Sequence, residues 1–272
     1  MAIITVSRQL GSLGTDIARR LADDLGYDYL DKETFGKALG DYGFSGIKIE
    51  KYDEKKPALW DVFSSDRDRF LLFMKIVIYS FAMKGGAVIV GRGGQVLLKG
   101  VPGVLNIRVE APIALRLERV QEKFGGDSRH ADKVIRGSDH DRNGFHRFFF
   151  NIDWEASEIY DLIINTKTFS VQAAVYLVER AIKTDEIKRS GKQAKAVLGN
   201  LALSQQVEAQ ILYEEEVPIQ YLEAMADDGV VTLRGAVTTM QIADRCVEVA
   251  RTVKGVSDVI NEFTLINYYG MM

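Results

Sequence analysis

Short apolar runs alternate with amphipathic helical patterns between residues 1 and 185, and this alternation constrains the fold most. The run Ala87–Val90 is wholly apolar and lies between Gly86 and Gly91, which predicts a strand buried on both faces. Further strands are expected at residues 3–6, 27–30, 104–109 and 162–164. Because helices separate these strands, the crossovers are right-handed and the sheet is parallel. The sequence therefore predicts an α/β fold, a parallel sheet flanked by helices.

The pattern changes after a charged stretch, residues 184–195, that has no apolar periodicity. Domain boundaries fall in such polar segments, so we place a linker at 186–195 between domains at 1–185 and 196–267. The second domain has the expected order helix, strand, strand, helix, strand. Asp228 and Gly229 form the hairpin turn between its first two strands. This order predicts a small α+β domain.

Composition excludes several classes of protein. The 272 residues are 47% hydrophobic and 27% charged, and the net charge of −3 gives no global attraction to nucleic acid. The single cysteine, Cys246, excludes an internal disulfide and a cysteine-based zinc cluster. The N-terminus reaches Arg8 too early for a signal peptide. The longest apolar stretch, 70–83, contains Lys75 and is too short to span a bilayer. We expect a soluble cytoplasmic protein without a transmembrane segment.

Residues 3–15, IITVSRQLGSLGT, predict a strand, a turn and the start of a helix. Such a turn aims backbone N–H groups and the positive end of the helix dipole at one point, which suits an anion. Glycines let the backbone approach a phosphate closely. The alternative is a tight turn with a capping hydroxyl and no ligand. The candidate phosphate-binding residues are Arg8, Gly11, Ser12, Leu13, Gly14 and Thr15.

A second glycine-rich turn, Gly91-Arg92-Gly93-Gly94, directly follows the predicted buried strand. Ligands of open α/β sheets bind at the carboxyl ends of the strands. A guanidinium binds two phosphate oxygens at once. Arg92 is therefore a candidate catalytic and substrate-binding residue, and the alternative is a surface arginine in a flexible loop.

The segment 129–147 carries all three histidines and a series of basic residues. On a continuous helix one stripe would contain Arg129, Lys133, Arg136, His140 and Arg147. Gly137 and Gly144 make the segment prone to hinging, which suits a flexible pair of helices that closes as a lid over transferring phosphates. The alternative is an ordinary solvated helix face. The histidine spacing fits no common zinc pattern, so no metal-ligating residue is predicted.

Residues 4–33, 88–120 and 134–166 resemble, in this order, three motif blocks of the cytidylate-kinase-like family, relatives of the P-loop nucleoside monophosphate kinases. The resemblance covers about residues 1–185 and implies a P-loop kinase fold with nucleotide substrates. It further implies ATP and Mg²⁺ as cofactors and an ATP-dependent phosphotransferase whose acceptor is undetermined. Arg142 best matches the family's lid arginine, Arg136 is the next candidate, and Asp31 and Asp141 are implied on the substrate side.

Three regions depart from the usual P-loop or cytidylate-kinase pattern. Gly14 stands where the usual P-loop has lysine, for which Arg8 or a lid arginine is a candidate substitute. The alternative is that this loss is a trait of the family, whose opening often shows Ser-Arg here. Gly93 replaces the aspartate of the family's Gly-Arg-Asp turn, so a ribose or metal contact is missing. Asp31 alone remains of a stretch near the nucleobase, so cytosine specificity is not expected; Asp31 would hold Mg²⁺ through water or cap a helix. These losses favour the alternative of a non-catalytic nucleotide sensor or pseudokinase, whereas the arginine-rich lid favours an enzyme.

Residues 223–266 are similar to a BON domain, with the similarity extending over about 196–267. The features that carry it include the stretch DGVVTLRGAV and the following helix with Ala243 and Ala250. The resemblance implies a regulatory or interaction module with a small ligand, a lipid or a protein as partner. A passive dimerisation domain, and therefore a homo-oligomer, is the alternative. No cluster of catalytic side chains is expected in this domain.

Overall fold

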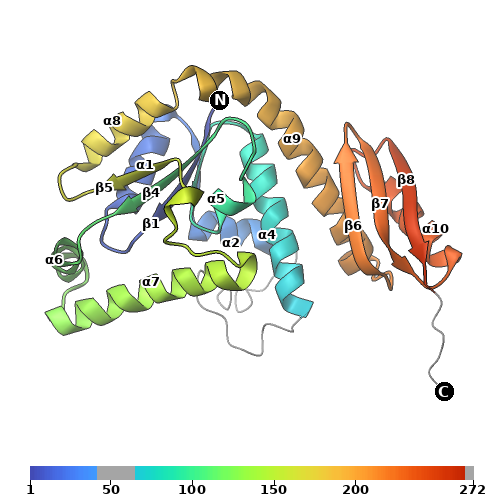
Figure 1. Ribbon diagram of the computed structural model, residues 1–272, viewed down its shortest axis with the longest axis horizontal. Helices are drawn as coiled ribbons and strands as arrows, with labels where there is room; N and C mark the ends of the chain where they lie inside the picture. The colour runs from blue at the N-terminus through green and yellow to red at the C-terminus, as the bar shows by residue number, and fades with distance from the viewer. Residues whose placement is uncertain (42–64, 267–272) are drawn as a thin grey trace. The chain divides into compact units, whose positions relative to one another are not determined.

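The computed structural model describes residues 1–41 and 65–266, which fall into two compact units (Figure 1). Of the described residues, the first unit comprises 1–41, 65–67 and 81–195. The second comprises 68–80 and 196–266. In the described ranges no helix combines the length and the apolar composition that crossing a membrane requires.

The first unit contains a five-stranded parallel sheet with the strand order β2-β3-β1-β4-β5. The strands are β1 (Ile3–Arg8), β2 (Asp28–Leu30), β3 (Ala87–Val90), β4 (Val104–Glu110) and β5 (Leu162–Asn165). All five lie where the apolar runs predicted them, and β3 is buried along its whole length. The predicted parallel α/β fold is confirmed. Because the strands are parallel, the turns after β1, β3 and β4 share one edge of the sheet.

Helices connect these strands. They are α1 (Gly14–Leu25), α2 (Lys32–Gly40), α4 (Ser65–Met83), α5 (Gly94–Leu97), α6 (Ile113–Phe124), α7 (Ser128–Phe150) and α8 (Val171–Ala181), with a 3-10 turn, η2, at Ser157–Ile159. The apolar sides of α1 and α8 pack with the sheet into one core, in which Ile17, Leu21 and Val178 are fully buried. Gly26 ends α1 at φ 62, a left-handed conformation that favours glycine.

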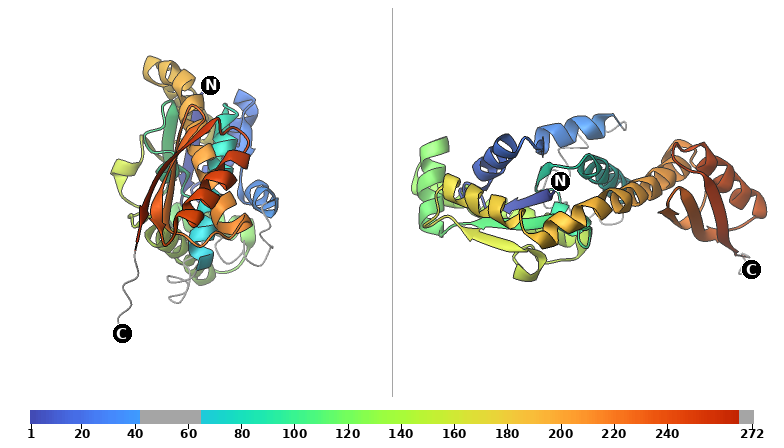
Figure 2. Two further views of the ribbon diagram at one scale, coloured as in Figure 1. Left: turned by 90° about the vertical axis from the view of Figure 1, so that its right-hand side faces the viewer. Right: turned by 90° about the horizontal axis from the view of Figure 1, so that it is seen from above.

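The second unit is a three-stranded sheet with helices on one face. Its elements are the end of α9 (Asp185–Ala209), a π-helical turn η3 (Gln210–Glu214), β6 (Gln220–Asp227), β7 (Val230–Val237), α10 (Met240–Thr252) and β8 (Asp258–Leu265). Strand β7 is central, antiparallel to β6 and parallel to β8. Figure 2 shows α10 along one face of this sheet, where its buried Cys246 packs with Val231 and Leu233. The predicted order is confirmed, with Asp228 and Gly229 at positive φ in the hairpin.

The segment proposed as a linker, 186–195, is helical and forms the first part of α9. Asp185 and Glu186 in the first turn complement the helix dipole, so the segment forms a helix despite its lack of apolar periodicity. The division between the compact units falls at Lys195 within this helix. The second unit also includes Asp68–Ser80 of α4, where the Phe73 ring lies 6.1 Å from the Tyr213 ring. The domain limits themselves stay a prediction.

Candidate functional site

The turn between β1 and α1 contains two residues in the left-handed conformation. Gly11 has φ 79 and Leu13 has φ 64, so a leucine adopts the left-handed conformation that normally favours glycine. No side chain caps the N-terminus of α1. The Ser12 hydroxyl, considered above as a phosphate donor or a cap, is fully buried and donates to the Gln9 carbonyl oxygen at 2.8 Å. The first amides of α1 therefore have no capping oxygen from the turn.

A pocket of about 100 Å³ opens over this turn. Five of the six turn candidates line it, and Ser12 does not. The lining also includes Arg142 from α7, so the pocket brings together two of the three regions that the sequence assigned to phosphate. The lining residues are Arg8, Gln9, Leu10, Gly11, Leu13, Gly14, Thr15, Asp16, Arg119, Val120, Lys123, Phe124 and Arg142.

The charge of this lining is strongly positive. The lining contains four basic side chains, from Arg8, Arg119, Lys123 and Arg142, and one carboxylate, that of Asp16. The chain as a whole carries a net charge of −3, so the pocket differs in sign from the protein. A concave site of one sign raises the local concentration of the opposite charge. Together with the N-terminal amides of α1, this lining suits a polyanion such as a polyphosphate.

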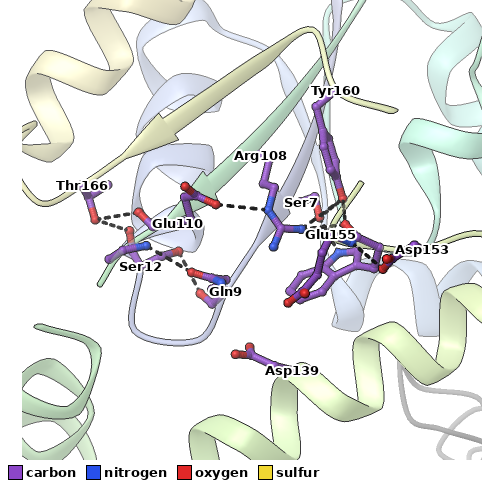
Figure 3. A network of polar contacts seen from close by, with 12 residues as sticks. Ser7, Gln9, Ser12, Arg108, Glu110, Asp139, Asp153, Glu155, Tyr160 and Thr166 are labelled. Atoms are coloured by element: carbon purple, nitrogen blue, oxygen red, sulfur yellow. Dashed lines mark hydrogen bonds and ion pairs between the residues drawn. The ribbon is translucent and has the colours of Figure 1, made fainter. Parts of the chain in front are cut away.

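Arg119 fixes the turn as well as lining the pocket. Its Nη1 donates to the Gly11 carbonyl oxygen at 3.2 Å and to Thr166 Oγ1 at 2.9 Å, and its Nη2 donates to the Thr166 carbonyl oxygen at 2.9 Å. Thr166 Oγ1 in turn donates to the Ser12 carbonyl oxygen at 3.0 Å (Figure 3). These bonds hold the turn against the end of β5. A site held in this way does not have to reorganise when an anion binds.

The sequence analysis missed Arg119 and Lys123. A signal exists, because Arg116, Arg119 and Lys123 follow one another at i, i+3 and i+7 on α6, which places them on one helix face. Arg116 is 4% exposed. Its Nε donates to the Leu10 carbonyl oxygen at 2.7 Å, and its Nη2 pairs with Asp139 Oδ2 of α7 at 2.6 Å. Arg116 therefore ties the turn, α6 and α7 together.

The lid prediction needs correction in two respects. Helix α7 is one continuous helix of 23 residues rather than a hinged pair, because Ile135, Phe145 and Phe149 bury its apolar face on both sides of the glycines. The five basic residues of the predicted stripe are all exposed. At about 100° per residue, Arg142 lies about 140° around the helix from Arg129, so the pocket residue is not part of that stripe.

The two lid arginines are in different surroundings. Arg142 lines the pocket, and its Nη1 donates to Ser138 Oγ at 2.7 Å. Arg136, the second candidate, is 73% exposed in its side chain and pairs with Asp132 one turn away at 2.8 Å. Neither Arg136 nor Asp141 lines the pocket. The structure thus separates Arg142 from the other residues proposed for the lid.

The second glycine-rich turn is buried, which excludes a surface arginine in a flexible loop. Arg92 adopts φ 58, is 3% exposed, and lies with its guanidinium 5.1 Å from the centre of the Phe35 ring. Gly93 has φ 66, and a Cβ there would lie 2.3 Å from Cε2 of Phe150. Phe150 therefore occupies the space that the side chain of an aspartate would need. Arg92 does not line the pocket over the first turn.

Asp31 follows β2 and acts as the cap of α2. Its Oδ1 accepts hydrogen bonds from the backbone N–H groups of Glu33 and Thr34, both at 3.0 Å. Burial alone would raise the pKa of Asp31, but these bonds and the charge of Arg19 outweigh it and lower the pKa. The capping role is thus shown, and Asp31 does not line the pocket. Within the described ranges, no three His, Cys, Asp or Glu side chains converge as metal ligands.

A buried polar network underlies the carboxyl end of β1. Ser7 Oγ accepts from Trp154 Nε1 at 2.7 Å and lies 3.1 Å from the Tyr160 hydroxyl. Arg108 Nη1 donates to the Trp154 carbonyl oxygen at 2.7 Å, and its Nε lies 3.6 Å from Glu110 (Figure 3). Burial raises the pKa of Tyr160. This network fixes the strand end from which the candidate phosphate-binding turn, residues 9–13, begins.

A second buried contact reaches α7. His146 is 2% exposed, with Nδ1 2.7 Å from the Arg142 carbonyl oxygen and Nε2 2.8 Å from Gln95 Nε2. Because a carbonyl oxygen only accepts and an amide nitrogen only donates, Nδ1 carries the proton. His146 thus links the helix after Arg92 to the backbone of Arg142. No pattern in the sequence indicated this contact.

Two family models match this chain. A model of the cytidylate kinase-like family matches residues 3–168, and a BON domain model matches 201–267. The cytidylate kinase of Methanocaldococcus jannaschii is 31% identical over 190 residues, 69% of this chain and 99% of that protein. The cytidylate kinase of Pyrococcus horikoshii is 28% identical over 199 residues, 72% and 97% of the two chains.

Among solved structures, an uncharacterized protein from Eubacterium ventriosum superposes with a TM-score of 0.54 at 21% identity. The match covers 68% of this chain and 99% of that one, and it shows a shared fold. The family match spans more than half of the chain and includes the phosphate turn, the Arg92 turn and α7. The chain therefore belongs to the cytidylate kinase-like family and carries a BON domain after the kinase-like domain.

Proposed function

We propose that this protein is an ATP-dependent phosphotransferase of the nucleoside monophosphate kinase type. One observation carries the proposal: four basic side chains from three separate segments converge with the N-terminus of α1 on one pocket. Phosphoryl transfer needs little covalent chemistry from a protein, so catalysis consists of positioning and charge neutralisation. The pocket has the charge and the rigid support for both tasks.

In this proposal the triphosphate of ATP lies across residues 11–15, with its oxygens on the backbone amides. Arg119 and Lys123 flank it from α6, and Arg142 reaches the γ-phosphate from α7. The acceptor oxygen attacks the γ-phosphorus, the bond from that phosphorus to the oxygen bridging to the β-phosphate breaks, and ADP leaves. Arg142 neutralises charge that spreads over the γ-oxygens during this step.

Mg²⁺ is the cofactor that the family implies, and the pocket offers two hard oxygen donors for it. Thr15 holds the Ser/Thr position of the P-loop pattern, and Asp16 supplies the carboxylate. Mg²⁺ bound with ATP would neutralise phosphate charge. Asp16 would otherwise repel the triphosphate, so its presence in a basic pocket favours a cation there. Asp31 is proposed as a structural cap and not as a magnesium ligand.

The acceptor is proposed to be a nucleoside monophosphate, because the relatives are named cytidylate kinases. Arg92 at the carboxyl end of β3 is the proposed acceptor-side cation. Since Arg92 is 3% exposed, acceptor binding must uncover it. We do not propose specificity for cytosine. We place the protein in the cytoplasm, because both nucleotides are supplied there. For the BON domain we propose a regulatory or interaction role.

A thermal-shift screen tests nucleotide binding most simply. ATP, ADP, AMP and CMP are added separately, each with and without Mg²⁺, to the full chain and to the Lys133→Ala control, an exposed α7 variant outside the pocket. Ligand at 100 times its Kd stabilises a protein by about 2.7 kcal/mol. We expect ATP with Mg²⁺ to raise the Tm of both proteins equally. No shift with any nucleotide would contradict the proposal.

The second candidate is a non-catalytic nucleotide sensor that acts through the BON domain. Phe150 favours it, because the ring fills the space beside Gly93 where the family's motif carries an aspartate. A sensor requires binding but no transfer, so it predicts the same thermal shift. The two functions separate only in an assay of acceptor-dependent ADP formation.

A further inference from the structure

Two departures from the P-loop pattern, at positions 8 and 14, lie next to each other in space. The P-loop pattern GxxxxGK[ST], placed with its last residue at Thr15, requires glycine at 8, glycine at 13 and lysine at 14. This chain has Arg8, Leu13 and Gly14 at those positions. The basic residue is thus absent from position 14 and present at position 8, where the pattern has glycine. The inference that follows rests on the proposed binding of a nucleotide at this turn.

The backbone of the turn keeps the conformation that the pattern's glycine allows. Leu13 adopts φ 64, the left-handed region that leucine rarely enters. Helix α1 still begins at residue 14, and Thr15 still lines the pocket. The substitutions have therefore changed which side chain the turn presents, while the path that aims the amides at the pocket remains.

Positions 8 and 14 compete for one space. A Cβ added to Gly14 would lie 2.4 Å from Cβ of Arg8 and 3.2 Å from its Cγ. It would also lie 3.1 Å from Cβ of Val109, which pairs with Arg8 in the sheet. Gly14 has no positive φ, so the obstacle to a side chain there is purely steric. A turn with a side chain at position 8 therefore excludes one at position 14.

We propose that Arg8 and Gly14 are an exchanged pair, in which Arg8 supplies from the end of β1 the phosphate-binding charge that a lysine at 14 would supply from α1. The stem of Arg8 packs where the side chain of residue 14 would begin, and Arg8 lines the same pocket. Its planar guanidinium binds two oxygens at once, so it suits the β- and γ-phosphates of one nucleotide. Gly14 is then required by Arg8, rather than being a mark of lost function.

The binding test uses isothermal titration calorimetry of the full chain with ATP, ADP and AMP in the presence of Mg²⁺. Arg8→Ala should weaken ATP and ADP binding by roughly 10- to 100-fold, the range expected for a lost charge-assisted hydrogen bond. AMP, which lacks the β- and γ-phosphates, should lose less than about threefold by the same argument. The double variant Arg8→Gly/Gly14→Lys should bind ATP more tightly than Arg8→Ala. Arg129→Ala, on the exposed face of α7, serves as the charge-loss control.

The steric part is tested separately by thermal unfolding without nucleotide. Gly14→Ala should lower the Tm of the parent clearly, or prevent its folding, and should lower the Tm of the Arg8→Gly variant much less, because only the contact with Cβ of Val109 then remains. Equal losses in both backgrounds would overturn the exchange. The exchange would also be overturned if Arg8→Ala bound ATP as tightly as the parent, or if the double variant bound ATP no more tightly than Arg8→Ala. A parent that binds no nucleotide would instead refute the proposed function, and the exchange with it.

Discussion

Two sets of basic residues on neighbouring helices differ in what holds them. Arg119 on α6 donates to carbonyl oxygens of the phosphate turn and of Thr166, both outside its own helix. Arg136 on α7 pairs only with Asp132 of its own helix in the contacts described, and its side chain is 73% exposed. Exposed pairs of this kind contribute little to stability and fix little geometry. We infer that contacts with the backbone of another element, rather than the number of charges, distinguish the residues of the candidate site.

Arg142 and Arg129 extend the comparison within a single helix. Both belong to α7, yet Arg142 lines the pocket and Arg129 is exposed. The backbone of Arg142 is further fixed by His146 through its carbonyl oxygen. A charge on a fixed support can be aimed at a developing charge without reorganisation, which is what catalysis by positioning requires. We therefore expect substitutions in the two sets to differ by orders of magnitude in their effect on the rate of phosphoryl transfer.

The largest effect is expected for Arg142→Ala. An arginine that acts on the transferring phosphoryl group is worth roughly 10³ to 10⁵ in rate. The variant should lose that much in kcat while its Kd for ATP changes less than about tenfold, because the contact is made mainly in the transition state. Steady-state kinetics with Mg²⁺-ATP measures both. Arg129→Ala is the matched control, and equal losses in the two variants would remove the distinction between pocket and stripe.

Gly11→Ala should abolish nucleotide binding, with a loss of roughly 100-fold or more if the turn is displaced from its anion-binding path. The reason lies in packing as well as in space for the phosphate: a Cβ at position 11 would lie 2.9 Å from the Arg116 carbonyl oxygen of α6, at φ 79. The turn would move off α6, and the Tm should fall too. Gly100→Ala is the control, because Gly100 has φ 78 but no atom within 4 Å. Similar losses of ATP affinity in both would contradict this reading.

Arg119→Ala should weaken ATP binding by roughly 10- to 100-fold and lower the free energy of unfolding by about 1–3 kcal/mol, since the acceptors on the buried Thr166 lose their donor. Arg119→Lys keeps the charge but cannot span the carbonyl oxygens of Gly11 and Thr166 together. We expect it to recover part of the affinity and little of the stability. Calorimetric titration and urea unfolding report the two quantities. Full recovery of both by lysine would mean that charge alone matters at this position.

The smallest effect is expected at Asp31, outside the pocket. Asp31→Ala should cost about 1 kcal/mol of stability through the lost helix cap, while Asp31→Asn, which still caps, should retain activity. The folded state lowers the pKa of Asp31 below its ordinary value of 3.8. Its contribution is therefore present above about pH 4 and is lost as the pH falls through the folded pKa. Unfolding measured between pH 3 and 7 checks this, and a large activity loss in Asp31→Asn would favour the magnesium role instead.

Local pattern predicted the sheet and the strand-turn-helix order at residues 3–15, because apolar runs and glycine positions are properties of adjacent residues. Contacts between residues far apart in the sequence could not be predicted from local pattern. A helical wheel groups Arg116, Arg119 and Lys123 on one face of α6, but it does not say that this face meets the turn at Gly11. The ring of Phe150 leaves no room for a side chain at position 93, although the two residues lie in different motif blocks. On α7 the regular spacing drew attention to the stripe, whereas Arg142 was singled out by the family resemblance, and only the structure places it in the lining of the pocket.

Acceptor-dependent release of ADP tests the central claim most directly. The full chain is incubated with ATP and Mg²⁺, alone and with each of a panel of nucleoside monophosphates, beside the Arg142→Ala variant. We expect ADP to form only when an acceptor and Mg²⁺ are both present, and we expect Arg142→Ala to lower the rate by roughly 10³-fold or more. If ATP binds but no monophosphate yields ADP above the acceptor-free rate, the protein is not a nucleotide kinase and the sensor function stands in its place.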